Sequence, residues 1–270
     1  LGLTAVTGGG DTLHTGVMTT KGVVGYDLTR LLIGSEGTLA IITEATLKLT
    51  PLPEAKRTLR ASYHDIHSAA RAVSAIMAQP VIPCALEFMD RACLGLVRDF
   101  AALELETGAG ALLMIEVDGP LAGIASAVEN VARAADGAGC VQIDSAETEA
   151  DIERLWRTRE ALSPALRNVA PKKINEDVVV PVSRMPELID GLQALAERFG
   201  ITIVNFGHAG NGNIHVNLLV DPDDANQMAA ADPCLDAVFD LVLALDGSLS
   251  GEHGIGLVKR QFVGRELDRT

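Results

Sequence analysis

The chain has 270 residues, 48% hydrophobic and 3% aromatic, enough to bury a sizeable core in one large domain or two modest ones. Its net charge of −14 argues against a nucleic-acid partner, because phosphates would be repelled, and an anionic substrate would need local cations. No run of 18 apolar residues and no secretory signal is present, so we expect a cytoplasmic protein without a transmembrane segment, attached at most peripherally to the inner face of the membrane.

The cysteines and the two ends of the chain give further information about the class of protein. Cys84, Cys93, Cys140 and Cys234 show no CxxC spacing, which favours buried reduced thiols over a disulfide framework or a zinc site. The sequence opens in mid-strand without an initiator Met and stops as a helix begins. We therefore expect a fragment of a longer protein.

Residues 1–53 are predicted to be a block of short strands that ends at two prolines. The run GGGD at 8–11 separates two apolar stretches and predicts a hairpin, and residues 26–32 predict one or two helical turns. Gly37 and Thr38 then stand at the entrance of a further strand. Their small side chains and free backbone N–H groups would let a planar cofactor or a phosphate approach closely, although a plain turn explains them equally well.

Residues 54–145 alternate between strand and helix patterns. Strands are predicted at 58–63, 83–89, 111–117 and 140–143. One helix is predicted to start at an Asp65 cap and to include Met77, another to span 122–135, and a short helix follows Met89 to about Ala101. Apart from the short helix the order is β-α-β-β-α-β. This predicts an α+β fold with a ferredoxin-like antiparallel sheet and helices on one face. No site chemistry is recognisable here, so the segment is interpreted as framework.

Residues 147–245 continue with long helices and one polar strand. Trp156, Arg159 and Ser163 fall three and four residues apart and line one face of a helix predicted at 147–167. In the strand that follows, a period of two places Lys173, Asn175 and Asp177 on one side. Two further helices are predicted, one from a Ser183 cap to Phe199 and one over 224–245.

A glycine-rich motif, GHAGNGNIH at 207–215, lies between two apolar runs. The Asn-Gly pair predicts a tight hairpin, with His208 and His215 facing each other across the turn. Along the second strand, Asn213, His215 and Asn217 share one face and the opposite face is apolar. A solvated strand usually carries Lys, Glu or Thr, so this polar row indicates a ligand or a metal.

A second motif, SGEHGIG at 250–256, places Glu252 next to His253 between glycines. Two His and one carboxylate form a recurrent ligand set that leaves coordination positions open for a substrate. Neighbouring side chains in an extended segment diverge, so Glu252 and His253 are not expected to bind the same ion.

Several of these motifs resemble one known family. YDLT at 26–29, GSEGTL at 34–39 and TEATL at 43–47 resemble the end of the FAD-binding domain of vanillyl-alcohol-oxidase-type flavoenzymes. The two His motifs resemble the metal motifs of the branch that holds the glycolate oxidase large subunit, D-lactate dehydrogenase and D-2-hydroxyglutarate dehydrogenase. The resemblance covers essentially the whole chain. It implies that residues 1–53 are the C-terminal remnant of the FAD-binding domain. Residues 54–270 would be a substrate- and metal-binding FAD-linked oxidase C-terminal domain, truncated at its end.

The resemblance also implies roles for individual residues. His208, His215 and Glu252 would bind a divalent metal, with zinc favoured over manganese or iron, and His253 would be the general base. The implied substrate contacts are Asn217, Arg159 for the carboxylate, Ser163, and Lys173 or Asn175; the implied FAD contacts are Gly37, Thr38 and Ile42. Asn211 stands where the family usually has Asp, which we expect to matter little because the position is not a ligand.

The implied reaction is flavin-dependent oxidation of a D-2-hydroxy acid, of the D-lactate or glycolate type, to the 2-oxo acid. A bound cation acidifies a coordinated hydroxyl, a neutral His accepts its proton, and FAD takes the hydride. Family members carry an N-terminal pyrophosphate-binding loop that is absent here, so this chain alone should not hold FAD tightly and should be inactive. A homodimer and an electron-acceptor protein or quinone are also implied.

Alternative functions remain open at this point. D-2-hydroxyglutarate would be the substrate if a second cationic site accompanied Arg159. A metal-dependent hydrolase could use the same His208, His215 and Glu252. A structural metal module without flavin chemistry would require a fourth protein ligand.

Overall fold

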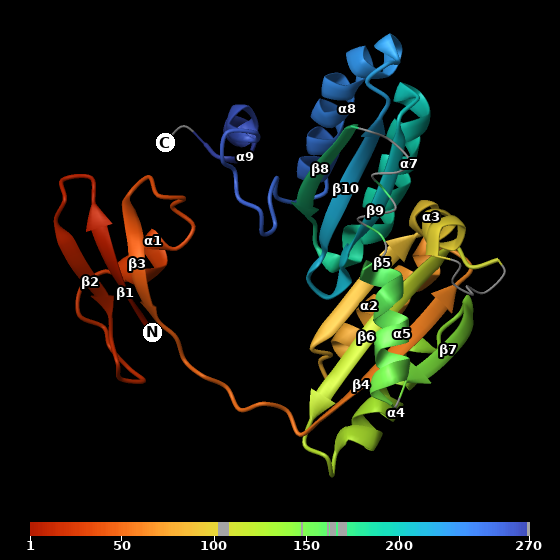
Figure 1. Cartoon of the computed structure of the whole chain (residues 1–270), viewed down its shortest axis with the longest axis horizontal. Helices are drawn as coiled ribbons and strands as arrows, with labels where there is room; N and C mark the ends of the chain where they lie inside the picture. The colour runs from red at the N-terminus through yellow and green to blue at the C-terminus, as the bar shows by residue number, and fades with distance from the viewer. Residues whose placement is uncertain (102–107, 147, 161, 163–165, 167–171, 269–270) are drawn as a thin grey trace. The chain divides into compact units, whose positions relative to one another are not determined.

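The computed structural model describes residues 1–101, 108–146, 148–160, 162, 166 and 172–268. The chain forms two compact units. The first comprises Leu1–Leu52 with Gly256–Val258, and the second comprises Pro53–Ile255 with Lys259–Thr270. Each unit has its own β-sheet, so the two are described separately (Figure 1).

The first unit is a three-stranded antiparallel sheet with one short helix. Its strands β1 (Gly2–Thr7), β2 (Thr12–Gly16) and β3 (Ala40–Thr46) are arranged in the order β2-β1-β3, and α1 spans Leu28–Leu32. The β1–β2 hairpin confirms the prediction at residues 8–11. The hydrophobic core of the first unit is small, and its buried cluster consists of Ala5, Leu32 and Ala40. Many large apolar side chains of this unit remain exposed, among them Val23, Val24, Tyr26, Leu49 and Leu52.

The second unit contains a seven-stranded sheet. Its strands are β4 (Ala55–Tyr63), β5 (Ala85–Asp90), β6 (Ala111–Gly119), β7 (Cys140–Ala146), β8 (Lys172–Val179), β9 (Thr202–His208) and β10 (Asn213–Val220). Its α-helices are α2 (Ile66–Ala78), α3 (Arg91–Ala101), α4 (Ile124–Ala135), α5 (Glu149–Glu160), α7 (Met185–Phe199), α8 (Ala225–Ala244) and α9 (Val263–Glu266). Short 3₁₀ turns are η1 (Val182–Arg184), η2 (Ala209–Asn211) and η3 (Arg260–Phe262).

The strand order of this sheet is β7-β4-β6-β5-β9-β10-β8, and every neighbouring pair is antiparallel. Its first four strands have the order expected of a β-α-β-β-α-β unit, with the first and third strands in the centre, which confirms the ferredoxin-like prediction. The strands β9, β10 and β8 extend that sheet beyond β5. The two parts meet through three residue pairs between β5 and β9, one of which is Glu87 with His208.

Helices cover both faces of the sheet (Figure 1). The larger hydrophobic cluster joins α2, α4, α7 and α8 to one face, which is the helical face that the sequence predicts. A second cluster on the other face includes Met89, Cys93, Leu112, Met114 and Leu155, so α3 and α5 form an additional layer. The reason is visible in β6, where consecutive apolar residues from Ala111 to Ile115 are buried on both faces of the strand.

Local sequence signals explain one end each of α2 and α7, but not the start of α7 that the sequence predicts. Asp65 caps α2 by accepting a hydrogen bond from Ser68 N–H, as predicted, and Gly200 ends α7 in the left-handed conformation at φ 64°. Ser183, however, is not the cap of α7, because it lies within the 3₁₀ turn η1. Pro186 has no N–H and fits only the first helical turn, so the α-helix begins at Met185.

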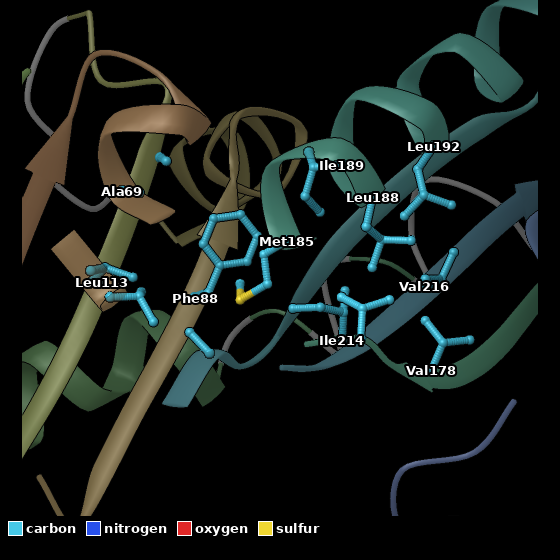
Figure 2. Close-up of a cluster of buried hydrophobic side chains, with 14 of the residues drawn as sticks. Ala69, Phe88, Leu113, Val178, Met185, Leu188, Ile189, Leu192, Ile214 and Val216 are labelled. Atoms are coloured by element: carbon cyan, nitrogen blue, oxygen red, sulfur yellow. The ribbon is translucent and has the colours of Figure 1, made fainter. Parts of the chain in front are cut away.

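Helix α7 packs on the strands that carry the glycine-rich motif. Figure 2 shows Met185 and Leu188 of α7 reaching toward Ile214 of β10, with Val216 close by. All four side chains are completely buried. Each large apolar side chain buried in this way stabilises the fold by roughly 1.5–3 kcal/mol. This packing fixes one face of β10 in the core and thereby turns its other face toward the opposite side of the sheet.

Candidate active site

The polar row predicted on β10 is present. Ile214, Val216 and Leu218 are fully buried in the core. The alternating residues Asn213, His215 and Asn217 lie on the other face, and β10 is flanked by β9 and β8. They are also buried, at 4%, 7% and 0% exposure. A polar side chain is stable in such a position only when its polar atoms find partners.

Several of those atoms find no partner within the described part of the chain. Asn217 donates from Nδ2 to the carbonyl oxygens of Val204 and His215, at 3.1 and 3.0 Å. Its Oδ1, the Oδ1 of Asn213 and the Nδ1 of His215 have no hydrogen-bond partner there. Leaving such a group unsatisfied costs about 1–3 kcal/mol. The pattern is that of a site prepared for a ligand.

His208, His215 and Glu252 converge. Their ligand atoms all lie within 4.8 Å of one another. The Nε2 atoms of His208 and His215 are 3.3 and 3.6 Å from the same oxygen, Oε1 of Glu252. Two imidazole nitrogens and one carboxylate oxygen are suitable donors for Zn²⁺ and related divalent ions. The residues present therefore fit a divalent cation.

The hairpin that brings the two His together is wider than predicted. Its loop has four residues, 209–212, and His208 pairs in register with Asn213, whereas His215 pairs with Phe206. The two imidazoles are therefore diagonal neighbours on one face, with ring centroids 5.3 Å apart. Gly212, at φ 74°, is the position where the left-handed conformation is required, and a Cβ there would lie 2.0 Å from the carbonyl oxygen of Val180.

Burial lowers the pKa of His215, and the nearby His208 lowers it further. A lowered pKa favours the neutral imidazole, which is the form that can donate its lone pair to a cation. His253 stacks on His215 with ring centroids 5.3 Å apart and an interplanar angle of 18°. Its side chain is 44% exposed, so the predicted general base is accessible from solvent.

Glu87 of β5 also belongs to this site, although no sequence motif indicates it. One carboxylate oxygen lies 2.5 Å from Nδ1 of His208, and the other accepts a hydrogen bond from Nε of Arg159 at 2.8 Å. The interpretation of residues 54–145 as pure framework is therefore wrong. In the sequence, Glu87 is a single glutamate within the apolar strand ALEFMD, and nothing in that strand marks it as functional. Only the pairing of β5 with β9 brings it next to His208.

Arg159 lies on α5, which packs on the same face of the sheet. Its guanidinium is stacked over the ring of Phe206 at 4.7 Å from the centroid, and the side chain is 21% exposed. Phe206 is in turn the cross-strand partner of His215. Arg159 is thus connected to the His cluster on two sides, through Glu87 and through Phe206.

Asp177 of β8 holds the segment that carries Glu252 and His253. One carboxylate oxygen accepts from the backbone N–H groups of Gly251, Glu252 and His253, and the other accepts from Lys259 at 2.5 Å. Burial raises the pKa of Asp177, but the hydrogen bonds from Glu252, Lys259 and His253 outweigh it and bring the pKa well below its ordinary value.

Close packing against β10 adds a second constraint on this segment. A Cβ at Gly251 would lie 2.5 Å from Oδ1 of Asn213, so glycine is needed for the approach. Contacts with β8 and β10 therefore account for Ser250 and Gly251 of this motif and hold the backbone of Glu252 and His253 in place.

The remaining predicted substrate residues are placed less directly. Lys173 and Asn175 share the polar face of β8, as predicted, opposite Leu219 and Asn217 respectively. His215 pairs with Asp177, so Asn175 is two register positions closer to His215 than Lys173 is. Ser163 lies outside the described residues.

The predicted FAD contacts lie in the first unit. Gly37, at φ 77°, Thr38 and Ile42 are exposed, and a Cβ on Gly37 would meet nothing closer than 3.4 Å, so a flat group could approach this turn. One expectation is wrong: the N–H of Thr38 is not free, because it donates to the carbonyl oxygen of Ser35 at 2.9 Å. A cavity of about 580 Å³ in this unit is lined by other residues, including His14, Tyr26 and Arg30.

Comparison with solved structures defines the class of fold. The chain is similar to p-cresol methylhydroxylase with substrate bound, with a TM-score of 0.70 at 15% identity over 99% of this chain and 62% of that one. It is also similar to alkyldihydroxyacetonephosphate synthase, with a TM-score of 0.63 at 19% identity over 92% and 48%. At these identities the likeness shows a shared fold.

The family is defined by sequence. Residues 52–270 match the family described as FAD linked oxidases, C-terminal domain, and the chain belongs to this family.

Curated relatives extend the match to the whole chain. It is 38% identical to glycolate oxidase subunit GlcD of Bacillus subtilis over 100% of this chain and 57% of the relative. It is 32% identical to a probable mitochondrial D-lactate dehydrogenase of Danio rerio, over 99% and 54%. It is 32% identical to D-2-hydroxyglutarate dehydrogenase of Xanthomonas citri, over 97% and 56%. The chain thus spans about half the length of these relatives. None of the helices described here is long and apolar enough to cross a membrane.

Proposed function

We propose that this chain forms the substrate- and metal-binding part of a flavin-dependent enzyme that oxidises a D-2-hydroxy acid to the 2-oxo acid. The observation that carries the proposal is the convergence of His208, His215 and Glu252 within 4.8 Å, next to His253 and Arg159. The names of the relatives, which include a glycolate oxidase subunit, a D-lactate dehydrogenase and a D-2-hydroxyglutarate dehydrogenase, supply the substrate class.

In this proposal His208, His215 and Glu252 hold the divalent cation, with zinc favoured over manganese or iron. A cation bound there would acidify the substrate hydroxyl, and FAD would accept the hydride. Arg159 binds the substrate carboxylate, for which its planar guanidinium is suited. His253 accepts the hydroxyl proton, and Asn217 lines the polar face beside it.

We further propose that the first unit is the C-terminal part of the FAD-binding domain. Gly37, Thr38 and Ile42 would lie near the flavin. Support comes from the exposed apolar side chains of this unit, which in a larger domain would be covered, and from the greater length of the relatives. An electron-acceptor protein or quinone would then reoxidise the flavin, and a cytoplasmic homodimer is the form we expect.

A structural metal is disfavoured by the donor count. Structural zinc sites usually have four protein ligands, whereas among the residues described the cluster of His, Cys, Asp and Glu has three. A hydrolase would use the same cluster, but it would leave the FAD-linked family membership without a role.

The test is a substrate screen on the full-length protein with D-lactate, glycolate and D-2-hydroxyglutarate, before and after treatment with a chelator. We expect bleaching of the flavin spectrum by at least one of these acids, loss of bleaching after chelation, and recovery with Zn²⁺ or Mn²⁺. The variant H253Q should retain Zn²⁺ and lose turnover. Flavin reduction that is insensitive both to chelation and to H253Q would contradict the proposed roles.

A further inference from the structure

We propose that Glu87 is a positioning residue that orients the metal ligand His208 and the carboxylate-binding Arg159 with one carboxylate. The inference rests on the proposed function and adds to it a residue outside both His motifs. Glu87 lies at the centre of β5, on the strand where the ferredoxin-like part of the sheet meets β9.

Each oxygen of the Glu87 carboxylate has a hydrogen-bond partner. One oxygen is 2.5 Å from Nδ1 of His208 and the other is 2.8 Å from Nε of Arg159. The Glu87 side chain is only 7% exposed, so water competes little for these contacts. The backbone enforces the first contact, because Glu87 and His208 are directly paired across β5 and β9. Such pairs place their Cβ atoms about 4.5–5.5 Å apart on one face of the sheet.

For His208 the consequence is a defined tautomer. An ionised carboxylate only accepts hydrogen bonds, so the proton of the neutral imidazole resides on Nδ1. The lone pair is then on Nε2, the atom that lies 3.3 Å from Glu252. Outer-shell carboxylates orient metal-binding imidazoles in this way, and their loss typically lowers metal affinity about 10–100-fold.

For Arg159 the consequence is a defined plane. The hydrogen bond from Nε and the stacking over Phe206 fix the guanidinium from its edge and from its face. The direction of its terminal nitrogens is thereby set before a substrate arrives, which is the condition for gripping a carboxylate at low entropic cost. Glu87 therefore sets the spacing between the metal position and the carboxylate-binding group.

The isosteric variant E87Q separates this role from a general structural one. A Gln side chain has one acceptor oxygen and one NH₂ donor, so it cannot offer a separate acceptor oxygen to Nδ1–H of His208 and to Nε–H of Arg159, as the carboxylate does. If its oxygen faces His208, Arg159 loses its partner. If it faces Arg159, the imidazole must move its proton to Nε2, where it blocks the metal.

The matched control is E116Q, on the neighbouring strand β6. In the described part of the chain, the Glu116 carboxylate contacts Lys56, at 2.8 Å, and Cys84, and neither of these belongs to the His cluster. Three readouts are needed for each variant. These are the affinity of the chain for Zn²⁺ alone by chelator competition, the ¹⁵N shifts of His208 in the metal-free chain, and KM and kcat for D-lactate in the full-length enzyme.

We expect E87Q either to bind Zn²⁺ at least tenfold more weakly or to raise KM for D-lactate at least tenfold. Its circular dichroism spectrum should remain that of a folded protein. E116Q should leave both within threefold. In the wild-type chain, Nδ1 of His208 should show the shift of a protonated nitrogen, and E87A should lose this preference. The proposal is overturned if E87Q keeps both its Zn²⁺ affinity and its KM for D-lactate within threefold of wild type. It is also overturned if the imidazole of His208 in the wild-type chain carries its proton on Nε2. The Zn²⁺ and NMR readouts need neither flavin nor turnover, so they decide the matter even if the proposed reaction fails.

Discussion

The two parts of the seven-stranded sheet satisfy their polar groups differently. Of the six buried side-chain polar atoms that lack a partner in the described chain, four belong to β9 and β10; they are on Asn205, Asn213, His215 and Asn217. The four ferredoxin-like strands contribute one, Oγ1 of Thr58, and the sixth is Nε of Arg184 in η1. Interior strand β6 carries an unbroken apolar run from Ala111 to Ile115.

This difference indicates a division of labour within one continuous sheet. The ferredoxin-like strands are built for stability, because, apart from Oγ1 of Thr58, their described buried side-chain atoms are apolar or hydrogen-bonded. The added strands retain unpaired polar atoms that cost stability unless a ligand is present, which is expected of functional sites. Glu87 and Asp90 of β5 link the two parts, since each carboxylate contacts a residue of β9.

The largest expected difference between the two parts concerns metal binding. H215A removes one of the three proposed donors, so Zn²⁺ affinity should fall by more than the roughly 100-fold seen for lost outer-shell contacts. Turnover of the full-length enzyme should fall with it. The comparison variant is T58A, which removes a buried unpaired polar atom from the other part. Equal Zn²⁺ affinities for H215A and T58A, measured by chelator competition, would refute the division.

The second-largest effect concerns the folding stability that the buried ion pairs of Lys259 contribute. Lys259 is 3% exposed and contacts both Asp177 and Glu176, at 2.5 and 3.4 Å. K259M leaves two buried carboxylates without their cation, and removing one partner of a buried ion pair costs about 3–5 kcal/mol. Urea unfolding should show a loss of this size. A loss below about 1 kcal/mol would mean that the Asp177 network contributes little to folding.

A third test uses pH at the boundary of the two parts. Burial raises the pKa of Asp90 from 3.8 to about 6, although it accepts hydrogen bonds from Cys93 and Asn205. The folded protein therefore holds a proton that the unfolded chain releases. Stability should fall as pH rises from about 4 to about 6, by on the order of 3 kcal/mol from this group.

The measurement is urea unfolding of wild type and D90N across this pH range. Because Asn does not titrate, the difference between the two curves should change over the window. A constant difference from pH 4 to pH 6 would contradict the raised pKa.

The smallest effect is expected for an exposed ion pair of the ferredoxin-like part. Lys56 pairs with Glu116 at 2.8 Å, and the Lys56 side chain is 52% exposed. K56M, the same change as K259M, should cost at most about 1 kcal/mol because solvent screens the pair. If K56M and K259M destabilise equally in urea, burial does not distinguish the two parts in the way we describe.

Individual elements show which features could be predicted from the sequence. A period of two placed Asn213, His215 and Asn217 on one face of β10 and Lys173, Asn175 and Asp177 on one face of β8, and the ladders agree. The hairpin register was harder, since the Asn-Gly signal suggested a two-residue turn where the loop has four residues. The free N–H expected at Thr38 and the cap expected at Ser183 were wrong because turn hydrogen bonds and a proline compete locally.

By itself, the sequence determined most of the elements and the ferredoxin-like order, because periodicity and caps are local signals, and its motifs pointed to the family that the chain belongs to. The candidate donors His208, His215 and Glu252 were implied by that resemblance, and their convergence appears only in the folded chain. Only the tertiary structure decided the partners of those donors. Glu87 is 121 residues from His208 and Asp177 is 75 residues from Glu252, and each is an unremarkable acid within its own strand. A hydrogen bond between such residues depends on which strands become neighbours, and the burial of whole apolar faces fixes that choice.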